Sequence, residues 1–203
     1  MNNVNEPDVQ IVELRLLERA AAGDREARRA LFERYRDDAY RVALRITGRP
    51  ADALDVVQDA FIRAFESLAD FQGRARFRTW LLRIVANRAR DLLRSRRVRQ
   101  AVSLDADESE NGAPQVAGAD PPASDAAERR ERAERIRAAV QSLPEAQRVV
   151  FALYATGEMT YGQIAEVLGI PVGTVMSRLY HARRRLAELL ADLAPPGRTQ
   201  EPS

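Results

Sequence analysis

Residues 160–186 read TYGQIAEVLGIPVGTVMSRLYHARRRL and decide the fold of the C-terminal part of the chain. Thr160 followed by Gln163 is a capping-box pattern, which opens a short helix. Gly169 and Pro171 then break the helix. A longer helical repeat follows, with a predicted buried face of Val175, Leu179, Ala182, Leu186 and Leu190. Short helix, glycine turn and basic helix predict a helix-turn-helix, and an ordinary helical hairpin is the alternative.

The second helix of this motif is predicted to place polar and basic side chains outside its buried face. In a helix-turn-helix the first residues of this helix contact base edges, and arginines further along hold phosphates. His181, the only histidine of the chain, is better interpreted as a DNA contact than as a metal ligand, because no second His and no Cys accompany it. The exposed set is Thr174, Met176, Ser177, Arg178, Tyr180, His181, Arg183 and Arg184.

Charge is strongly segregated along the 203 residues. The chain has 32 basic and 30 acidic residues, a net charge of +2, and all of its bases are arginine. That net charge alone would argue against nucleic acid. Residues 73–99, however, carry +9, residues 100–128 carry −7 and residues 167–187 carry +4. The pattern predicts two basic segments that contact nucleic acid, separated by an acidic one.

Composition excludes several classes of function. Zero cysteines remove disulfides, thiolate nucleophiles and Cys-ligated metal sites. We find no nucleophile–base pair, phosphate-binding loop or metal-ligand spacing, so the sequence predicts no enzyme, no cofactor and no metal. No apolar run is long enough for a membrane span, and the polar start lacks a signal-peptide pattern. We therefore expect a cytoplasmic binding protein without membrane insertion.

The acidic segment is also the predicted linker. Residues 100–126 contain Pro114, Pro121 and Pro122, and they lack sustained apolar periodicity, so they cannot offset the entropy of ordering. The sequence therefore predicts an all-α protein of two small helical domains, residues 9–99 and 127–193, joined by an acidic flexible linker. Residues 194–203 are predicted to form a disordered tail.

The first domain is predicted to contain three helices after an N-cap at Asp24. The first ends at Gly48, and the second covers about residues 51–68. The second turns Ala53, Val56, Val57, Ala60, Phe61, Ala64 and Phe65 inward and shows Asp52, Asp55, Gln58, Asp59 and Arg63 on its other face. An acidic face of this kind is either solvated or a docking surface for a basic partner, and solvation is the interpretation that the residues alone favour.

A third helix, about residues 77–97, carries a basic stripe. Phe77, Leu81, Ile84, Val85 and Leu92 form its apolar side, and Arg83, Asn87, Arg90, Arg94 and Arg97 share another face. Asp91 is the only acid nearby in sequence, which favours a phosphate footprint over salt-bridged solvation. Trp80 either packs beside Ile84, the interpretation we favour, or offers a stacking surface to an unpaired base.

These segments resemble a known family. Residues 51–61, ADALDVVQDAF, and 77–87, FRTWLLRIVAN, are similar to region 2 of a bacterial extracytoplasmic-function (ECF) RNA polymerase sigma factor of the sigma-70 family. Residues 143–151, LPEAQRVVF, and 164–179, IAEVLGIPVGTVMSRL, are similar to region 4 of that family. The resemblance covers residues 10–98 and 130–192, in the order that the family has.

The resemblance implies a promoter-specificity subunit whose partners are core RNA polymerase, promoter DNA and an anti-sigma factor. The face formed by Asp52, Asp55, Gln58, Asp59 and Arg63 would dock on the polymerase clamp helices, and the linker would thread the basic interior of polymerase. The minus-ten element would be recognised and melted by Phe77, Trp80, Arg83, Asn87, Arg90, Arg94 and Arg97. The minus-thirty-five element would be read by Met176, Ser177, Tyr180 and His181 and held by Thr174, Arg178, Arg183 and Arg184.

Two positions depart from the family pattern. Leu54 stands where members often have Glu, and Met176 stands where they often have Arg or Lys. Because Met cannot form a bidentate pair with guanine, Met176 favours an apolar contact such as a thymine methyl group. The alternative function is a free-standing helix-turn-helix regulator, which would leave the basic stripe of the first domain unexplained.

Overall fold

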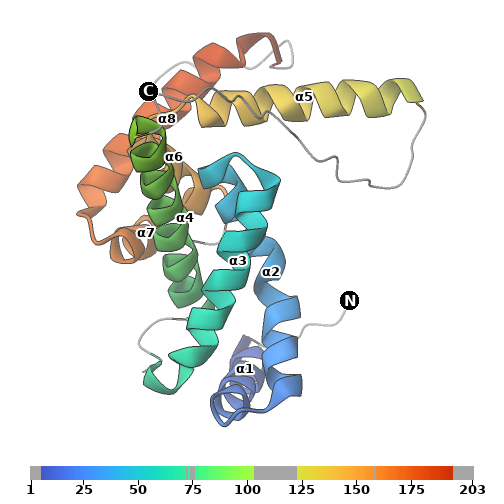
Figure 1. Ribbon diagram of the computed structural model, residues 1–203, viewed down its shortest axis with the longest axis vertical. Helices are drawn as coiled ribbons and strands as arrows, with labels where there is room; N and C mark the ends of the chain where they lie inside the picture. Colours follow the sequence, from blue (N-terminus) through green and yellow to red (C-terminus); the bar gives the residue numbers. More distant parts are fainter. Residues whose placement is uncertain (1–5, 72, 74–75, 103–122, 158, 194–203) are drawn as a thin grey trace. The chain divides into compact units, whose positions relative to one another are not determined.

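The computed structural model describes residues 6–71, 73, 76–102, 123–157 and 159–193. The chain divides into two compact units, residues 1–107 and 108–203. The described residues form α-helices with short 3-10 turns, and no strand occurs among them (Figure 1). The predicted all-α fold is confirmed.

The first unit consists of α1 (Glu6–Ala21), α2 (Arg25–Thr47), α3 (Pro50–Glu66), the 3-10 turn η1 (Leu68–Asp70) and α4 (Phe77–Val102). Helix α2 contacts α1, α3 and α4, and α3 contacts α4. As predicted, Asp24 caps α2, because its carboxylate accepts hydrogen bonds from the Glu26 and Ala27 amides at 2.9 and 3.2 Å. Helix α1 is a finding of the structure, since the sequence pattern predicted helices of this domain only after Asp24.

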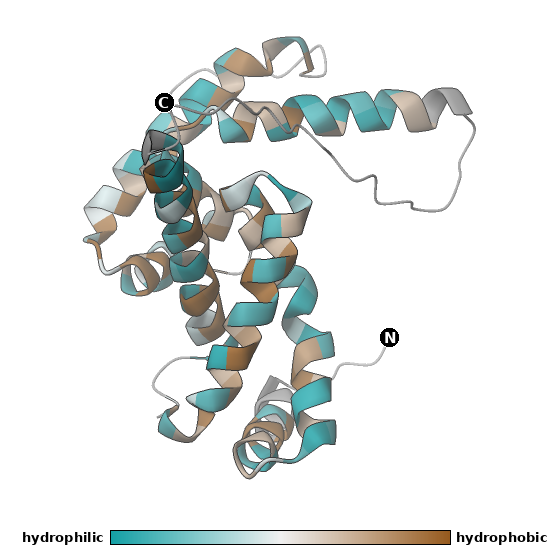
Figure 2. Ribbon diagram, in the orientation of Figure 1, coloured by the Kyte–Doolittle hydropathy of each residue, from teal (hydrophilic) through white to brown (hydrophobic). Residues whose placement is uncertain are grey.

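One apolar core holds these helices together. The predicted inward residues of α3 are buried except Phe65, which is half-buried, and α4 buries Leu82, Ala86 and Ala89 in addition to the predicted Phe77, Leu81 and Val85. Apolar and polar positions alternate along α2, α3 and α4, as expected for helices with one buried face (Figure 2). The Tyr35 hydroxyl donates to Glu13 of α1 at 2.7 Å, and burial raises its pKa above the ordinary value.

An ion pair at the edge of this core joins α2 to α4. Arg78 Nε donates to Asp38 Oδ2 at 2.7 Å, and the two side chains are only 12% and 16% exposed. Asp38 also pairs with Arg41 of α2. Burial would raise the pKa of Asp38, but hydrogen bonds from the two guanidinium groups outweigh burial and hold that pKa below its ordinary 3.8.

The second unit consists of α5 (Ala123–Gln141), α6 (Glu145–Tyr154), α7 (Tyr161–Leu168), α8 (Val172–Leu189) and the 3-10 turn η2 (Ala191–Leu193). Helix α8 contacts α5, α6 and α7 through the predicted face, in which Leu190 is half-buried and the other four residues are buried. The capping box of Thr160 and Gln163 is present, and Gly169 ends α7 with φ 63°. The predicted helix-turn-helix is therefore confirmed.

Both helices that flank the predicted linker extend into it. Helix α4 continues to Val102, and α5 begins at Ala123 and is hydrophilic along most of its length (Figure 2). Gln100 and Ala101 are good helix formers, and the acidic and small residues at 123–126 suit a helix start. Both edges of the range 100–126 are therefore helical. Residues 103–122 and the predicted tail lie outside the described residues.

We predict that Asp38→Asn lowers the free energy of unfolding of the first unit by about 1–3 kcal/mol at about pH 7, because Arg78 loses its charged partner. The folded-state pKa of Asp38 lies below 3.8, so this contribution is present above that pH and is lost as the pH falls through the folded-state pKa. The deficit of the variant should therefore shrink toward about pH 2. Urea unfolding followed by the fluorescence of Trp80, the only tryptophan, measures this unit in the full chain.

Asp37→Asn is the matched control for Asp38→Asn. The neighbouring Asp37 side chain is 77% exposed and should show little effect on stability. A deficit of Asp38→Asn that is equally large at both ends of the pH range would contradict the proposed role of its charge.

Candidate nucleic-acid and partner interfaces

The arginines of α4 fall into two groups. Arg78, Arg88 and Arg96 lie toward the neighbouring helices and pair with Asp38, Asp59 and Asp52, respectively. The sequence made no prediction for this group, for which α2 and α3 supply acids that lie 29 to 44 residues away in sequence.

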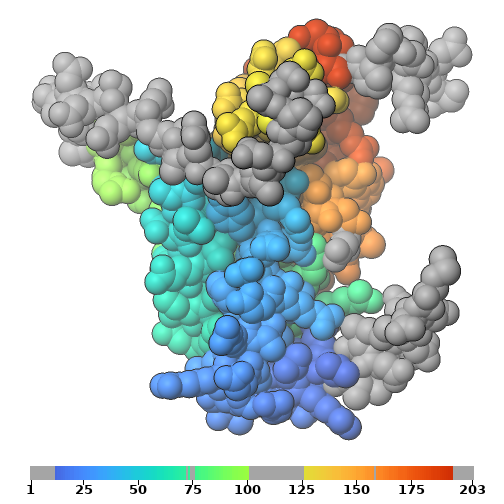
Figure 3. All heavy atoms as spheres, turned by 90° about the vertical axis from the view of Figure 1, so that its right-hand side faces the viewer, coloured from blue at the N-terminus to red at the C-terminus, as the bar shows by residue number. Residues whose placement is uncertain are grey.

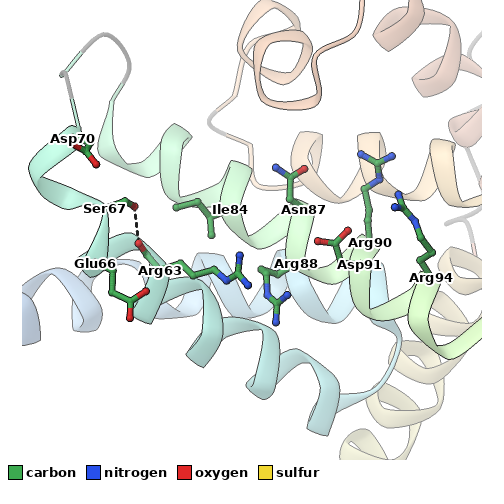
Figure 4. Close-up of a pocket in the computed structure, with 10 residues that line it drawn as sticks. All are labelled: Arg63, Glu66, Ser67, Asp70, Ile84, Asn87, Arg88, Arg90, Asp91 and Arg94. Atoms are coloured by element: carbon green, nitrogen blue, oxygen red, sulfur yellow. Dashed lines mark hydrogen bonds between the residues drawn. The ribbon is translucent and has the colours of Figure 1, made fainter. Parts of the chain in front are cut away.

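The second group is the predicted stripe, and it lies opposite the core. Arg83, Asn87, Arg94 and Arg97 are exposed and Arg90 is half-buried. Their spacing of four and three residues keeps them on one side of the helix. Figure 4 shows Asn87 and Arg90 projecting from one side of α4, while Arg88 lies on the side toward Arg63 of α3. The side chains of this stripe can thus reach a polyanion without breaking the ion pairs that hold α4.

A groove runs between the end of α3, the η1 turn and α4 (Figure 4). It contains the predicted Asn87, Arg90 and Arg94 together with a set of residues that the sequence did not single out for it: Arg63, Glu66, Ser67, Asp70, Ile84, Arg88 and Asp91. An amide, a guanidinium group and an aliphatic side chain therefore line one opening. Such a combination can hydrogen-bond the edge of a flat polar group and contact its face.

Phe77 and Trp80 belong to an aromatic cluster. Phe77 is 1% exposed, so its prediction as a DNA contact is wrong: it is a core residue of α4. Trp80 is half-buried and its ring lies 5.1 Å from that of Phe71 and 5.8 Å from that of Phe77. Packing, the interpretation favoured from the sequence, therefore describes the contacts of Trp80.

The exposed face of α3 differs from the predicted acidic one. Asp52 is 4% exposed and paired with Arg96, so its prediction as part of an exposed docking face is wrong. Asp59 is half-buried and paired with Arg88. The α3 surface, as we call Leu54, Asp55, Gln58 and Ile62, is exposed instead, with Leu54 60% and Ile62 48% exposed.

Figure 3 shows α3 at the molecular surface beside α2. Leu54 and Ile62 were not among the residues that the helical spacing predicted to face inward, but that spacing did not assign them to a surface. Arg63, which was predicted on the same face, is exposed and lines the groove toward α4.

Helix α8 presents the predicted residues outside its buried face. Met176, Ser177, Tyr180, His181, Arg183 and Arg184 are exposed, and Thr174 and Arg178 are half-buried. The rings of Tyr180 and His181 lie 5.4 Å apart, and Arg184 forms an exposed ion pair with Glu188 at 3.5 Å. The exposed side of α8 thus combines uncharged side chains near its start with arginines further along.

Arg183 has a partner that the sequence did not suggest. Its guanidinium lies 4.5 Å from the ring centroid of Tyr154, the last residue of α6, and Tyr154 in turn lies 5.9 Å from the ring of Tyr161 at the start of α7. The stack joins all three helices of the helix-turn-helix region. It restricts where the charge of Arg183 can lie.

Other kinds of site have little support. Within the described residues, no group of three or more His, Cys, Asp or Glu side chains is arranged to hold a metal ion. Among the helices that the structure describes, none is both long enough and apolar enough for a membrane span.

Comparison with known proteins gives one consistent answer. The family model for Sigma-70 region 2 matches residues 31–99, and that for Sigma-70, region 4 matches residues 133–186. The ECF RNA polymerase sigma factor SigW of Bacillus subtilis is 31% identical over 173 residues, which are 84% of this chain and 92% of SigW. The ECF RNA polymerase sigma-E factor of Escherichia coli K12 is 35% identical over 182 residues, 87% of this chain and 93% of that protein.

Solved structures agree. CnrH, in complex with the cytosolic domain of CnrY, matches with a TM-score of 0.64 at 30% identity over 88% of this chain and 97% of CnrH. The sigma factor RpoE from Bartonella quintana, in complex with the anti-sigma factor NepR, shares the fold with a TM-score of 0.60 at 23% identity over 91% of this chain and 97% of RpoE. With both sigma regions matched in order by family models and by relatives over most of their length, the chain belongs to the sigma-70 family as an ECF RNA polymerase sigma factor, a promoter-specificity subunit.

Proposed function

We propose that this sigma factor directs core RNA polymerase to promoters through three surfaces and has no catalytic activity of its own. The α3 surface binds polymerase, the stripe and groove of α4 bind the minus-ten element, and α8 reads the minus-thirty-five element. The observation that carries the proposal is the division of the α4 arginines, which leaves one basic side opposite the core. Action in the cytoplasm, where polymerase meets promoter DNA, is part of this proposal.

The minus-ten element meets α4 in two ways. Arg83, Arg94 and Arg97 neutralise phosphates along the strand, which supplies affinity that does not depend on sequence. The groove beside Asn87 and Arg90 takes up an extruded base, whose edge hydrogen-bonds to the amide while Ile84 contacts its face. Such contacts offset the free energy lost when a base leaves the duplex.

The minus-thirty-five element meets the exposed side of α8. Residues of its first turns contact base edges in the major groove, and Arg178, Arg183 and Arg184 hold phosphates on either side. The half-buried position of Arg178 and the stack of Arg183 on Tyr154 limit the motion of these charges, which reduces the entropy that binding must offset.

The α3 surface suits a protein partner rather than a nucleic acid. Leu54 and Ile62 supply exposed apolar area, and Asp55 and Gln58 lie between them in sequence. Protein interfaces combine apolar contacts with polar ones, and Asp55 favours a basic partner such as the polymerase clamp helices. The departure at Leu54 then replaces a charged contact with an apolar one.

Regulation by an anti-sigma factor completes the proposal. The relative CnrH was solved in complex with the cytosolic domain of another protein, CnrY. This chain is 30% identical to CnrH over 88% of its length, which supports a similar protein partner here.

We predict that Asp55→Arg weakens binding to core polymerase by about tenfold or more, since charge reversal at a central interface position typically costs over 1.4 kcal/mol. The measurement is co-elution and titration of the full chain with core polymerase. Asp37→Arg, which reverses an exposed acid on α2, is the matched control and should leave this binding intact. Unchanged binding by Asp55→Arg would contradict the assignment of the α3 surface, and failure of the unaltered chain to bind core would contradict the whole proposal.

We predict that Arg83→Ala and Arg94→Ala each lower the salt dependence of promoter binding by about one phosphate contact, with similar losses on different promoter sequences. Both side chains are exposed, so stability should not change. Holoenzyme binding to promoter DNA is titrated at several salt concentrations. Arg36→Ala on α2 is the control, and an identical salt slope for all four proteins would contradict the phosphate role.

We predict that Tyr154→Leu lowers the affinity for minus-thirty-five DNA about two- to fivefold, as expected for loss of a cation–π contact of about 0.5–1 kcal/mol. Tyr154→Phe keeps the ring face and should bind as the unaltered chain does. In a double-mutant cycle Tyr154→Leu should have no further effect once Arg183 is alanine. Additive losses in that cycle would show that Tyr154 does not act through Arg183.

A further inference from the structure

One strip of α8 carries no charge, although Arg183 lies beside it and Arg184 continues it toward the end of the helix. Gly173, Met176, Ser177 and Tyr180 are spaced by three, four and seven residues from the first, so they lie on one side of the helix, and all four are exposed. Met176 is 54% and Tyr180 is 62% exposed. We call these four residues the uncharged strip.

No contact among the residues of the second unit that the structure describes explains this exposure. The apolar stripe of α8 that packs on α5, α6 and α7 is a different one, and its residues Val175, Leu179, Ala182 and Leu186 are at most 8% exposed. Met176 and Tyr180 add nothing to that core. Large apolar side chains that are exposed together on a basic helix indicate a contact with a ligand.

Gly173 points to a ligand that approaches closely. It lies in the first turn of α8, where its backbone is helical and where an added methyl group would meet no atom within 4 Å. The described structure therefore gives no steric reason for glycine, and alanine would favour the helix. Glycine here leaves the start of α8 bare on the side that Met176 and Tyr180 share.

The charges around the strip decide which ligand fits. Residues 167–187 contain four arginines and no acid, and Arg184 continues the same side of α8 toward its C-terminus. A basic rim suits a polyanion, and the major groove of DNA is a polyanion that also offers apolar groups, the C5-methyl groups of thymine. A guanine edge, by contrast, offers two acceptors, for which the strip holds no cationic donor.

We propose that the uncharged strip selects thymine in the minus-thirty-five element, with Met176 and Tyr180 packing on thymine methyl groups and Gly173 allowing α8 to enter the groove deeply. The inference rests on the proposed function of α8 and specifies its base preference. Ser177 lies between the two apolar side chains, and its hydroxyl forms a single hydrogen bond with a neighbouring base edge, as donor or as acceptor. Specificity then comes from shape and methyl contacts, and the arginines contribute affinity.

The test begins with a selection. Holoenzyme assembled from core polymerase and the full chain selects from duplex DNA that is randomised across the minus-thirty-five region. Thymine should be enriched at adjacent positions. Met176→Arg should shift the selection at one of these positions toward guanine, because arginine can form the bidentate pair.

The second step removes only the methyl groups. Each selected thymine is replaced in turn by deoxyuridine, and we expect about a fourfold loss of affinity for each methyl group in contact, from the usual value of a buried methylene group. Holoenzyme with the Met176→Ala variant should bind DNA with thymine and DNA with deoxyuridine equally well at the position that Met176 contacts. Arg184→Ala is the control: it should weaken binding to both DNAs by the same factor, as loss of a phosphate contact does.

Gly173→Ala separates folding from recognition. Its thermal unfolding, followed by circular dichroism, should occur at the same or a higher temperature, while its affinity for the selected DNA should fall at least severalfold. An affinity that does not fall would show that no close approach occurs there.

The outcomes distinguish the inference from the function on which it rests. Enrichment of guanine opposite the strip would overturn thymine selection. So would a loss of affinity on replacing thymine by deoxyuridine that is as large in the Met176→Ala variant as in the unaltered chain. Either result would leave α8 as the helix that reads the minus-thirty-five element. If no variant of α8, Arg184→Ala included, changed DNA binding, the proposed function of α8 would itself fail and the strip would belong to a protein interface.

Discussion

Three ion pairs between α4 and its neighbours decide which arginines of the first unit face the apolar core and which face outward. Arg78, Arg88 and Arg96 bind Asp38, Asp59 and Asp52, which α2 and α3 supply. A charge near a protein core is costly unless it is paired, so these contacts offset the cost of placing three arginines beside the core. The stripe of Arg83, Asn87, Arg90, Arg94 and Arg97 lies on the opposite side of α4 and faces away from the core.

The pairing also decides what α3 can offer. Asp52 and Asp59 form ion pairs with arginines of α4. The face of α3 that the sequence predicted to be acidic therefore has less unpaired negative charge than predicted. Leu54, Asp55, Gln58 and Ile62 are what remains exposed, a mixed surface with two large apolar side chains. One set of contacts thus shapes both the basic side of α4 and the α3 surface.

In the second unit, apolar packing decides which side of α8 is buried and which is exposed. Helix α8 is buried along one stripe and anchored at its side by the stack of Arg183 on Tyr154. Its start is ordered by the break after α7, where Gly169 adopts the left-handed conformation that ends that helix. Because packing and stacking occupy one flank, the remaining side of α8 combines an uncharged strip with a basic rim.

Much of the fold could be predicted from local patterns in the sequence. The capping box at Thr160, the turn at Gly169, the N-cap at Asp24 and the end of α2 at Gly48 are short-range features, in which a side chain bonds a backbone group a few residues away or glycine accepts a positive φ. Apolar spacing predicted the buried faces of α3 and α8 for the same reason. The family resemblance of both regions also rests on such local stretches.

Only the tertiary structure decided which charged and aromatic side chains are free to act. Phe77 and Asp52 are chemically suited to the roles that the sequence predicted for them, yet one is in the core and the other is paired with an arginine 44 residues away. Tyr154 of α6 contacts the guanidinium of Arg183 of α8, and the spacing of residues in the sequence does not predict this contact. A sequence records the charge and shape of each residue, but the energy of a charge depends on what surrounds it, and those surroundings exist only when distant helices have packed together.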